Sequence, residues 1–131
     1  MPPPTAKRLS GLKVLVVEDS FLIAEHVSSV LRKQGCEVLG PAPRLAAGLA
    51  LVERGPPPDC AVLDVNLHGE LCFPIAKALA RRAVPFVFLT GYDDRTIIPP
   101  DLAGARVLGK PMEDALLVDA IASAVAHGKA S

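Results

Sequence analysis

The feature that most constrains the fold is a set of five short apolar runs separated by segments with helical periodicity. The runs are Lys13–Glu18, Glu37–Pro41, Cys60–Asp64, Pro85–Thr90 and Arg106–Lys110. Most of them are near-continuous in hydrophobicity rather than alternating, which is typical of strands that are covered on both faces in a parallel sheet. Alternation of such strands with helices predicts a doubly wound α/β domain.

The segments between the runs carry apolar residues at helical spacing. Helices are predicted over Ser20–Gln34, Arg44–Arg54, Glu70–Arg82 and Met112–Ala126. Ser20 is expected to cap the first of these helices, while Gly35 and Gly128 are expected to end the first and the last.

The connection between the fourth and fifth strands differs from the others. It contains Pro99 and Pro100, and consecutive prolines are poorly tolerated inside a helix. We therefore expect the fourth helix to be short, distorted or mobile.

The composition of the chain argues against several classes of function. The chain has 131 residues, half of them hydrophobic, which suits one domain with a core that needs no disulfide or structural metal. Its 14 basic and 14 acidic residues balance, so no basic surplus argues for direct nucleic-acid binding. No apolar run has the length of a membrane span, and the start lacks a signal-peptide core. We expect no membrane partner and a cytoplasmic location.

The domain organisation is simple. We expect a flexible proline-rich leader over residues 1–12, one domain over residues 13–128, and a tail over residues 129–131. Cys36, Cys60 and Cys72 are widely spaced in apolar surroundings, so they are expected to be buried and reduced rather than metal-binding.

Chemically useful side chains follow four of the five strands. Glu18 and Asp19 follow the first strand, Asp64 ends the third, Thr90 ends the fourth and Lys110 ends the fifth. Ligands of open parallel sheets bind beyond the carboxyl ends of the strands, so these residues are expected to meet. Three carboxylates favour a hard cation such as Mg²⁺. A lysine and a hydroxyl beside them suit phosphoryl transfer to a carboxylate.

Each of these residues also has a plainer interpretation. Asp19 has the chemistry of a helix cap, Asp64 that of a strand-end cap, and Lys110 that of an exposed lysine before a helix. Their combination favours the metal and phosphoryl site. For His68, a surface loop is favoured over the rim of the site, because loops run over the surface.

Together these residues resemble the pattern of a receiver domain of a two-component response regulator, over about residues 13–127. The resemblance implies a flavodoxin-like (βα)5 fold with strand order 2-1-3-4-5, and Asp64 as the phosphoacceptor. It implies Mg²⁺ bound directly by Asp19 and Asp64, by the backbone carbonyl of Asn66, and through water by Glu18.

The same resemblance implies that Lys110 pairs with the phosphoryl group and that Thr90 closes onto it. The implied partners are a histidine kinase or phosphotransfer protein and a downstream protein. An enzymatic role beyond self-catalysed acceptance and hydrolysis of the phosphoryl group is not expected.

A narrower resemblance lies in PFVFLTGYDD, residues 85–94. It is similar to a group of single-domain receivers, mostly alphaproteobacterial, with a Phe-x-Thr-Gly-Tyr pattern, here Phe88, Thr90, Gly91 and Tyr92. In that group the fourth helix is often short or disordered, and the kinases are typically of the HWE or a related type. Gly91 and Tyr92 thereby join the predicted switch residues.

Three positions depart from the usual receiver. Leu67 and His68 stand where Met-Pro is usual, and Val107 replaces the usual switch aromatic of the fifth strand. Tyr92 either substitutes for that aromatic or is a half-exposed loop residue without a role, and the residues leave both open.

Three function classes remain. The first is a phosphorylation-controlled switch that binds protein partners without an output domain of its own. The second is a phosphate sink that drains a kinase without output contact. The third, a small flavodoxin-like enzyme or nucleotide-binding module, lacks the glycine-rich loop after the first strand.

Overall fold

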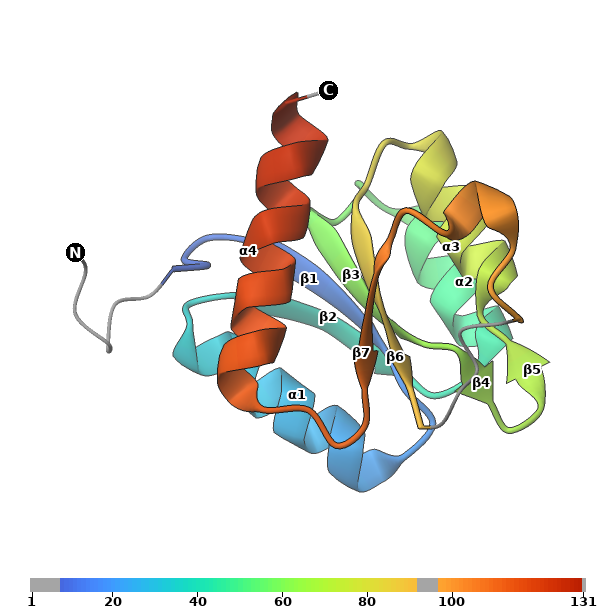
Figure 1. Ribbon diagram of the computed structural model, residues 1–131, viewed down its shortest axis with the longest axis horizontal. Helices are drawn as coiled ribbons and strands as arrows, with labels where there is room; N and C mark the ends of the chain where they lie inside the picture. The colour runs from blue at the N-terminus through green and yellow to red at the C-terminus, as the bar shows by residue number, and fades with distance from the viewer. Residues whose placement is uncertain (1–7, 92–96, 131) are drawn as a thin grey trace.

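The five apolar runs form one parallel sheet. Its strands are β1 (Lys13–Val17), β2 (Glu37–Ala42), β3 (Cys60–Asp64), β6 (Phe86–Thr90) and β7 (Arg106–Gly109). Their spatial order is β2-β1-β3-β6-β7, which confirms the predicted 2-1-3-4-5 order. The computed structural model shown in Figure 1 describes residues 8–91 and 97–130, and the side chains of residues 127–130 lie outside that description.

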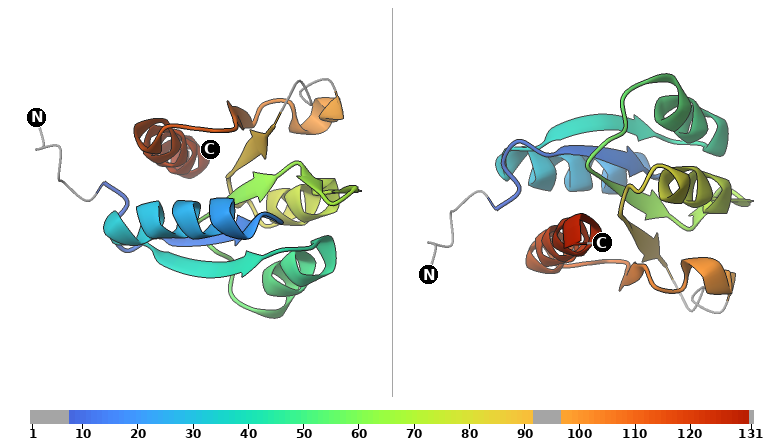
Figure 2. Two further views of the ribbon diagram at one scale, coloured as in Figure 1. Left: turned by 90° about the horizontal axis from the view of Figure 1, so that it is seen from below. Right: turned by 90° about the horizontal axis from the view of Figure 1, so that it is seen from above.

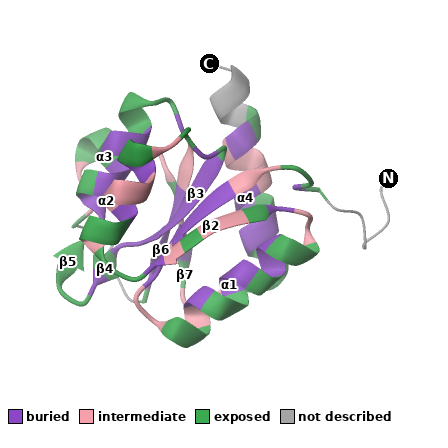
Figure 3. Cartoon of the chain, turned by 180° about the vertical axis from the view of Figure 1, so that it is seen from behind, coloured by how far each residue is buried: buried purple, intermediate pink, exposed green. Residues whose placement is uncertain are grey.

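Four α-helices are described, and they cover both faces of the sheet. They are α1 (Phe21–Lys33), α2 (Leu45–Arg54), α3 (Phe73–Arg81) and α4 (Asp114–Ala130). Helices α1 and α4 lie on one face, and α2 and α3 lie on the other (Figures 1 and 2). Strands β1 and β3 are buried along almost their whole length (Figure 3). The two apolar layers on either side of them hold the sheet in place.

Both predicted caps of α1 are confirmed. The hydroxyl of Ser20 accepts a hydrogen bond from the backbone N–H of Ile23 at 3.4 Å. Gly35 has a φ of 86°, and its N–H donates to the carbonyl of Arg32 while that of Cys36 donates to Leu31. This is the Schellman arrangement, which favours glycine at the residue after the cap.

Two predicted boundaries are wrong. Helix α4 continues through Gly128 to Ala130, because glycine in a helix costs only about 1 kcal/mol and does not by itself end one. Helix α3 begins at Phe73 rather than at Glu70. Glu70–Leu71 instead forms β5, which pairs with β4 (Asn66–Leu67) in a short antiparallel hairpin.

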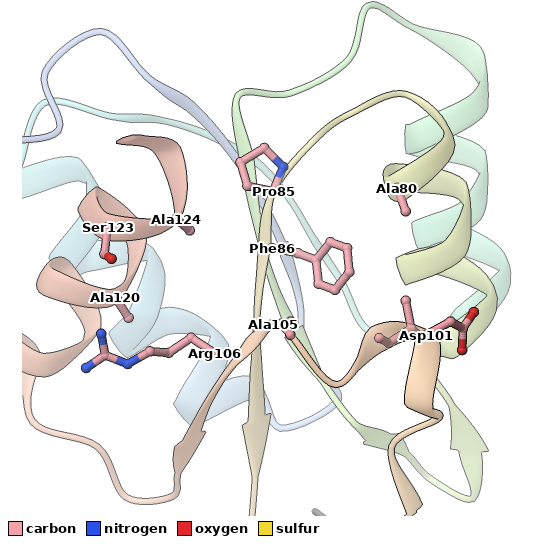
Figure 4. A pocket seen from close by; sticks show the side chains of 11 residues that line it. Ala80, Pro85, Phe86, Asp101, Ala105, Arg106, Ala120, Ser123 and Ala124 are labelled. Carbon is pink, nitrogen blue, oxygen red and sulfur yellow. The ribbon is translucent and has the colours of Figure 1, made fainter. Parts of the chain in front are cut away.

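The connection between β6 and β7 is short of helix, as predicted. Within its described part, residues 97–105, the helical structure is η2 (Pro100–Leu102), a single 3₁₀ turn. A pocket of about 600 Å³ lies beside it, lined by η2, α3, α4 and the first residues of β6 and β7 (Figure 4). The pocket is at the end of the strands opposite to their carboxyl ends, so it is separate from the predicted site.

The N-terminal boundary differs from the predicted leader over residues 1–12. Leu9 is only 1% exposed and belongs to the core between the sheet and helices α1 and α4. Arg8 forms an ion pair with Asp119 of α4. Residues 8–12 therefore pack on the domain, and the rest of the proposed domain division stays a prediction.

The three cysteines are buried and free, as predicted. Burial raises the pKa of Cys60 and of Cys72 to about 12, which keeps both thiols protonated at neutral pH. Within residues 8–91 and 97–130, no helix combines the length and the hydrophobicity needed to cross a membrane.

A bulge between β1 and β2 positions the start of the site. The register passes from Leu15–Leu39 to Val17–Ala42, so β2 carries one extra residue. Gly40 lies in this bulge with a φ of 96°. The carbonyl of Ala42 then accepts from the N–H of Glu18 at 3.0 Å, which fixes the residue that leaves β1.

Gly40→Ala is expected to lower the free energy of unfolding by about 2 kcal/mol or more. A Cβ at Gly40 would lie 2.8 Å from the backbone N of Ala42 and 2.9 Å from the carbonyl O of Val16, in addition to the strain of a positive φ. Gly55→Ala is the control, because a Cβ there meets nothing within 4 Å. Urea denaturation of both variants measures the difference, and equal stability would contradict this account of the bulge.

Candidate functional site

The polar residues at the carboxyl ends of the strands converge at one edge of the sheet. Glu18 and Asp19 follow β1, and Asp64 ends β3, which pairs with β1. One carboxylate oxygen from each of the three lies within 4.8 Å of the others. We call Glu18, Asp19 and Asp64 the acidic cluster.

Glu18 is the most deeply buried member of the acidic cluster, at 1% exposure. Its Oε2 accepts a hydrogen bond from the N–H of Ser20 at 3.1 Å, and its Oε1 lies 2.7 Å from the ammonium of Lys110. Since Ser20 is the N-cap of α1, the interpretation of Asp19 as that cap is wrong.

Lys110 joins β7 to the acidic cluster. Its Nζ lies 3.0 Å from Asp64 Oδ2 and 2.7 Å from Glu18 Oε1. Burial would lower the pKa of this ammonium, but hydrogen bonds with Glu18 and Asp64 outweigh burial and raise it. The side chain therefore stays charged, and its backbone N–H donates to the carbonyl of Thr90 at 2.7 Å.

Asp64 carries the strongest electrostatic perturbation of the cluster. Burial, followed by the neighbouring carboxylates of Glu18 and Asp19, raises its pKa from 3.8 to about 8, against the opposing effect of Lys110. For Asp19, burial would raise the pKa, but hydrogen bonds with Asp64 and Glu18 and the charge of His68 lower it. Asp64 therefore holds a proton at neutral pH unless a bound cation replaces that proton.

The crowding of three carboxyl groups makes the donor set suitable for a hard divalent cation. Three carboxylates share one small volume with a single lysine, and a cation between them removes the repulsion that raises the pKa of Asp64. Carboxylate oxygens with room for water are also the ligands that Mg²⁺ prefers.

The remaining predicted residues lie around the cluster. Thr90 is 2% exposed at the end of β6, and Gly91 after it is exposed. The N–H of Asn66 donates to Asp64 Oδ1 at 3.3 Å, while the ligand role of its carbonyl stays a prediction. Tyr92 lies outside the described residues.

His68 makes a contact with the acidic cluster that the sequence interpretation held as the less favoured alternative. It lies on a surface loop and its side chain is 66% exposed, yet its Nδ1 is 2.9 Å from Asp19 Oδ2. The favoured surface loop and the alternative position at the rim of the site thus both describe His68. The cause is the turn between β4 and β5, where His68 has a φ of 53° and Asn66 Oδ1 accepts from the N–H of Gly69. No periodicity in the sequence signals a positive φ at histidine.

Comparison with known proteins identifies the family. The family model for the response regulator receiver domain matches residues 14–122. The chain belongs to the response regulator receiver family. Members of this family are signalling modules, not enzymes. They receive phosphoryl groups from histidine kinases or phosphotransfer proteins and bind Mg²⁺ at an acidic pocket, which corresponds here to Glu18, Asp19 and Asp64.

Individual relatives agree with this assignment. The receiver is 30% identical over 118 residues to the transcriptional regulatory protein PdtaR of Mycobacterium tuberculosis, covering 88% of this chain and 57% of PdtaR. It is 29% identical over 106 residues to the sensory transduction protein LytT of Bacillus subtilis, covering 79% of this chain and 44% of LytT. The chain thus spans about half the length of these curated relatives.

Two solved structures are also similar. The solution structure of SdrG from Sphingomonas melonis has 37% identity and a TM-score of 0.73, with 93% of this chain and 98% of SdrG covered. The crystal structure of the response regulator PhyR from Brucella abortus has a TM-score of 0.82 at 23% identity, covering 95% of this chain and 51% of PhyR. The second likeness shows the fold alone.

The raised pKa of Asp64 predicts a pH dependence of stability without metal. The folded carboxyl titrates at about 8 and the ordinary one at 3.8, so between these values the folded chain binds more protons than the unfolded chain. The contribution of Asp64 is thus fully present below the ordinary pKa and is lost as pH rises through the folded value. We expect this decline to disappear in Asp64→Asn.

The measurement is urea denaturation with a chelator at several values from about pH 5 to about pH 8. Asp101→Asn, which removes an exposed carboxylate of η2, is the matched control and is expected to keep the wild-type slope. The same slope in Asp64→Asn as in the wild type would show that the buried carboxyl is not the titrating group.

Proposed function

We propose that this receiver accepts a phosphoryl group on Asp64 from a histidine kinase, in a Mg²⁺-dependent reaction in the cytoplasm, and acts as a phosphorylation-controlled protein-interaction switch. The observation that carries the proposal is the position of the Asp64 carboxylate, which is buried at a strand end 3.0 Å from the Lys110 ammonium and beside two further carboxylates.

The residues around Asp64 supply what the transfer requires. Asp19, Asp64 and the backbone carbonyl of Asn66 would hold Mg²⁺ directly, with Glu18 acting through water. When bound, the ion supplies positive charge for the equatorial oxygens of the phosphoryl group. Lys110 favours the ionised carboxylate of Asp64, which is the nucleophilic form.

The transfer step balances without a further reactant. The bond between phosphorus and the kinase imidazole nitrogen breaks, and a bond between phosphorus and an ionised Asp64 oxygen forms. The second ring nitrogen of the phosphohistidine carries a proton, so the ring leaves as neutral imidazole. Phosphorylation puts roughly two negative charges beside Glu18 and Asp19. Lys110 lies within 3.0 Å of Asp64 and is placed to offset part of that charge.

In the proposed switch, a conformational change would begin at Thr90 and extend into the segment that follows it. The Thr90 hydroxyl moves onto a phosphoryl oxygen, and the chain from Gly91 to Ala103, including Tyr92, changes its order. Support comes from the described part of this segment, where η2 is a single turn beside a pocket of about 600 Å³.

The narrower group with the Phe-x-Thr-Gly-Tyr pattern is also part of the proposal. The 37% identity to SdrG over 93% of this chain supports it, and so does the short helical content between β6 and β7. A kinase of the HWE or a related type is the proposed phosphodonor, and a downstream protein is the proposed target.

Asp64→Asn is expected to abolish phosphorylation, because the amide lacks the nucleophilic oxygen. Incubation with Mg²⁺ and a small phosphodonor, followed by intact mass measurement, should add one phosphoryl group to the wild type and none to the variant. The control is Asp59→Asn, whose carboxylate lies just before the opposite end of β3 and accepts from the N–H of Lys13. A phosphoryl group retained in Asp64→Asn would refute the acceptor.

Thr90→Ala is expected to separate phosphorylation from the switch. The variant keeps the acidic cluster and Lys110, so it should be phosphorylated to within a few-fold of the wild-type extent. Amide hydrogen exchange over residues 97–103 should slow on phosphorylation of the wild type and stay unchanged in the variant. If exchange in the phosphorylated wild type does not change, the phosphate sink becomes the better account.

A further inference from the structure

The ammonium of Lys110 is held from two sides. Its Nζ lies 2.7 Å from Glu18 Oε1 and 3.0 Å from Asp64 Oδ2. The Lys110 side chain is mostly buried, that of Glu18 is fully buried and that of Asp64 is nearly so. Only one of these two carboxylates, Asp64, is the proposed phosphoacceptor. The two contacts therefore differ in what happens to them during the reaction.

Glu18 is fixed at both its backbone and its side chain. Its N–H donates to the carbonyl of Ala42 at 3.0 Å, and its Oε2 accepts from the N–H of Ser20 at 3.1 Å. The other carboxylate oxygen, Oε1, faces Lys110. Glu18 thus offers the ammonium a partner whose position is set by β2 and by the first residues of α1.

Lys110 is the residue that needs such a partner. A lysine has a four-carbon stem with several rotatable bonds, and its compact ammonium is strongly hydrated. Without a fixed partner the side chain would gain rotamers and contacts with water. Asp64 alone cannot supply that partner throughout the reaction, because its oxygens are the ones that take up the phosphoryl group, whereas the Glu18 carboxylate is not consumed.

We propose that Glu18 is a positioning residue that holds the Lys110 ammonium beside Asp64 while Asp64 reacts. An ammonium has three donors, so Lys110 can keep its contact with Glu18 and still donate to a phosphoryl oxygen on Asp64. This role is additional to the water-mediated contact of Glu18 with Mg²⁺. The inference rests on the proposed function, since it takes Asp64 to be the acceptor.

The competing account is that Glu18 acts only within the acidic cluster, through its charge or through water on the metal. In that case the loss of its charge changes the phosphorylation rate whether or not Lys110 is present. If Glu18 acts through Lys110, its loss slows phosphorylation only while the ammonium is there. The coupling between the two substitutions therefore separates the accounts.

The test is a double-mutant cycle on the full chain with Glu18→Gln and Lys110→Ala, alone and combined. The rate of phosphorylation by acetyl phosphate is followed by intact mass. Saturating Mg²⁺ removes differences in metal affinity and in the protonation of Asp64 from the comparison. We expect Glu18→Gln to slow the wild type about tenfold or more relative to its effect in Lys110→Ala. The control is Glu25→Gln, which removes an exposed carboxylate of α1 and should have the same effect in both backgrounds.

A second measurement needs no phosphorylation. Acetic anhydride modifies lysines, and peptide masses report how fast each one reacts in the metal-free protein. Modification of Lys110 should be several-fold faster in Glu18→Gln than in the wild type. In Asp64→Asn it should stay slow, because Glu18 still holds the ammonium. Lys33, an exposed lysine in the last turn of α1, serves as the internal reference and should react alike in all variants.

Each outcome decides the question. Equal effects of Glu18→Gln in the two backgrounds overturn the positioning role and leave Mg²⁺-dependent phosphorylation of Asp64 intact. So does modification of Lys110 as fast as that of Lys33 in Asp64→Asn, a result that does not depend on how Glu18→Gln folds. If the wild type takes up no phosphoryl group, the proposed function and this inference fail together.

Discussion

The ion pairs of Lys110 with Glu18 and Asp64 are the contacts on which the site depends. They place one ammonium 2.7 Å and 3.0 Å from two carboxylates that would otherwise repel each other at the edge of the sheet. A buried group of charges such as this is weak evidence for stability, because removing charges from water costs free energy. Its value here is chemical: the charges that repel one another in the acidic cluster are the ones that the proposed cation and phosphoryl group would engage.

Strand register holds the charged residues of the site in place despite this cost in free energy. The bulge at Gly40 lets Ala42 hold the N–H of Glu18, and the N–H of Lys110 is bound by the carbonyl of Thr90. Both charged partners of Asp64 are therefore tied to neighbouring strands by their own backbones. Apolar layers on both faces of the sheet hold those strands. The distances between the charged groups of the site therefore depend on the packing of the whole sheet.

The sequence predicts the parts of this arrangement that depend on periodicity and on strand ends. The strands and the convergence of Glu18, Asp64 and Lys110 follow from apolar runs and from the common edge of a parallel sheet, whereas the strand order was implied by the resemblance to receiver domains. The hairpin of β4 and β5 does not follow from periodicity, because Glu70 pairs with Leu67 and Leu71 pairs with Asn66 instead of joining the helical pattern that follows. The contact of His68 follows from that hairpin, so the sequence alone could only offer it as the less favoured alternative.

Thr90 lies between a buried strand and a connection with little regular secondary structure. Its own strand β6 lies between β3 and β7 and is nearly all buried. In the described part of the connection that follows, helical structure is limited to 3₁₀ positions at Ile97 and in the three-residue turn η2. A movement of β6 itself would disturb close packing and the pairing of that strand with β3 and β7. A movement of the described part of the connection between β6 and β7 costs less free energy, because it has little regular hydrogen bonding. The proposed switch would therefore act through the connection after β6, because of this contrast in local stability, even though Val107 offers no aromatic ring to report the change.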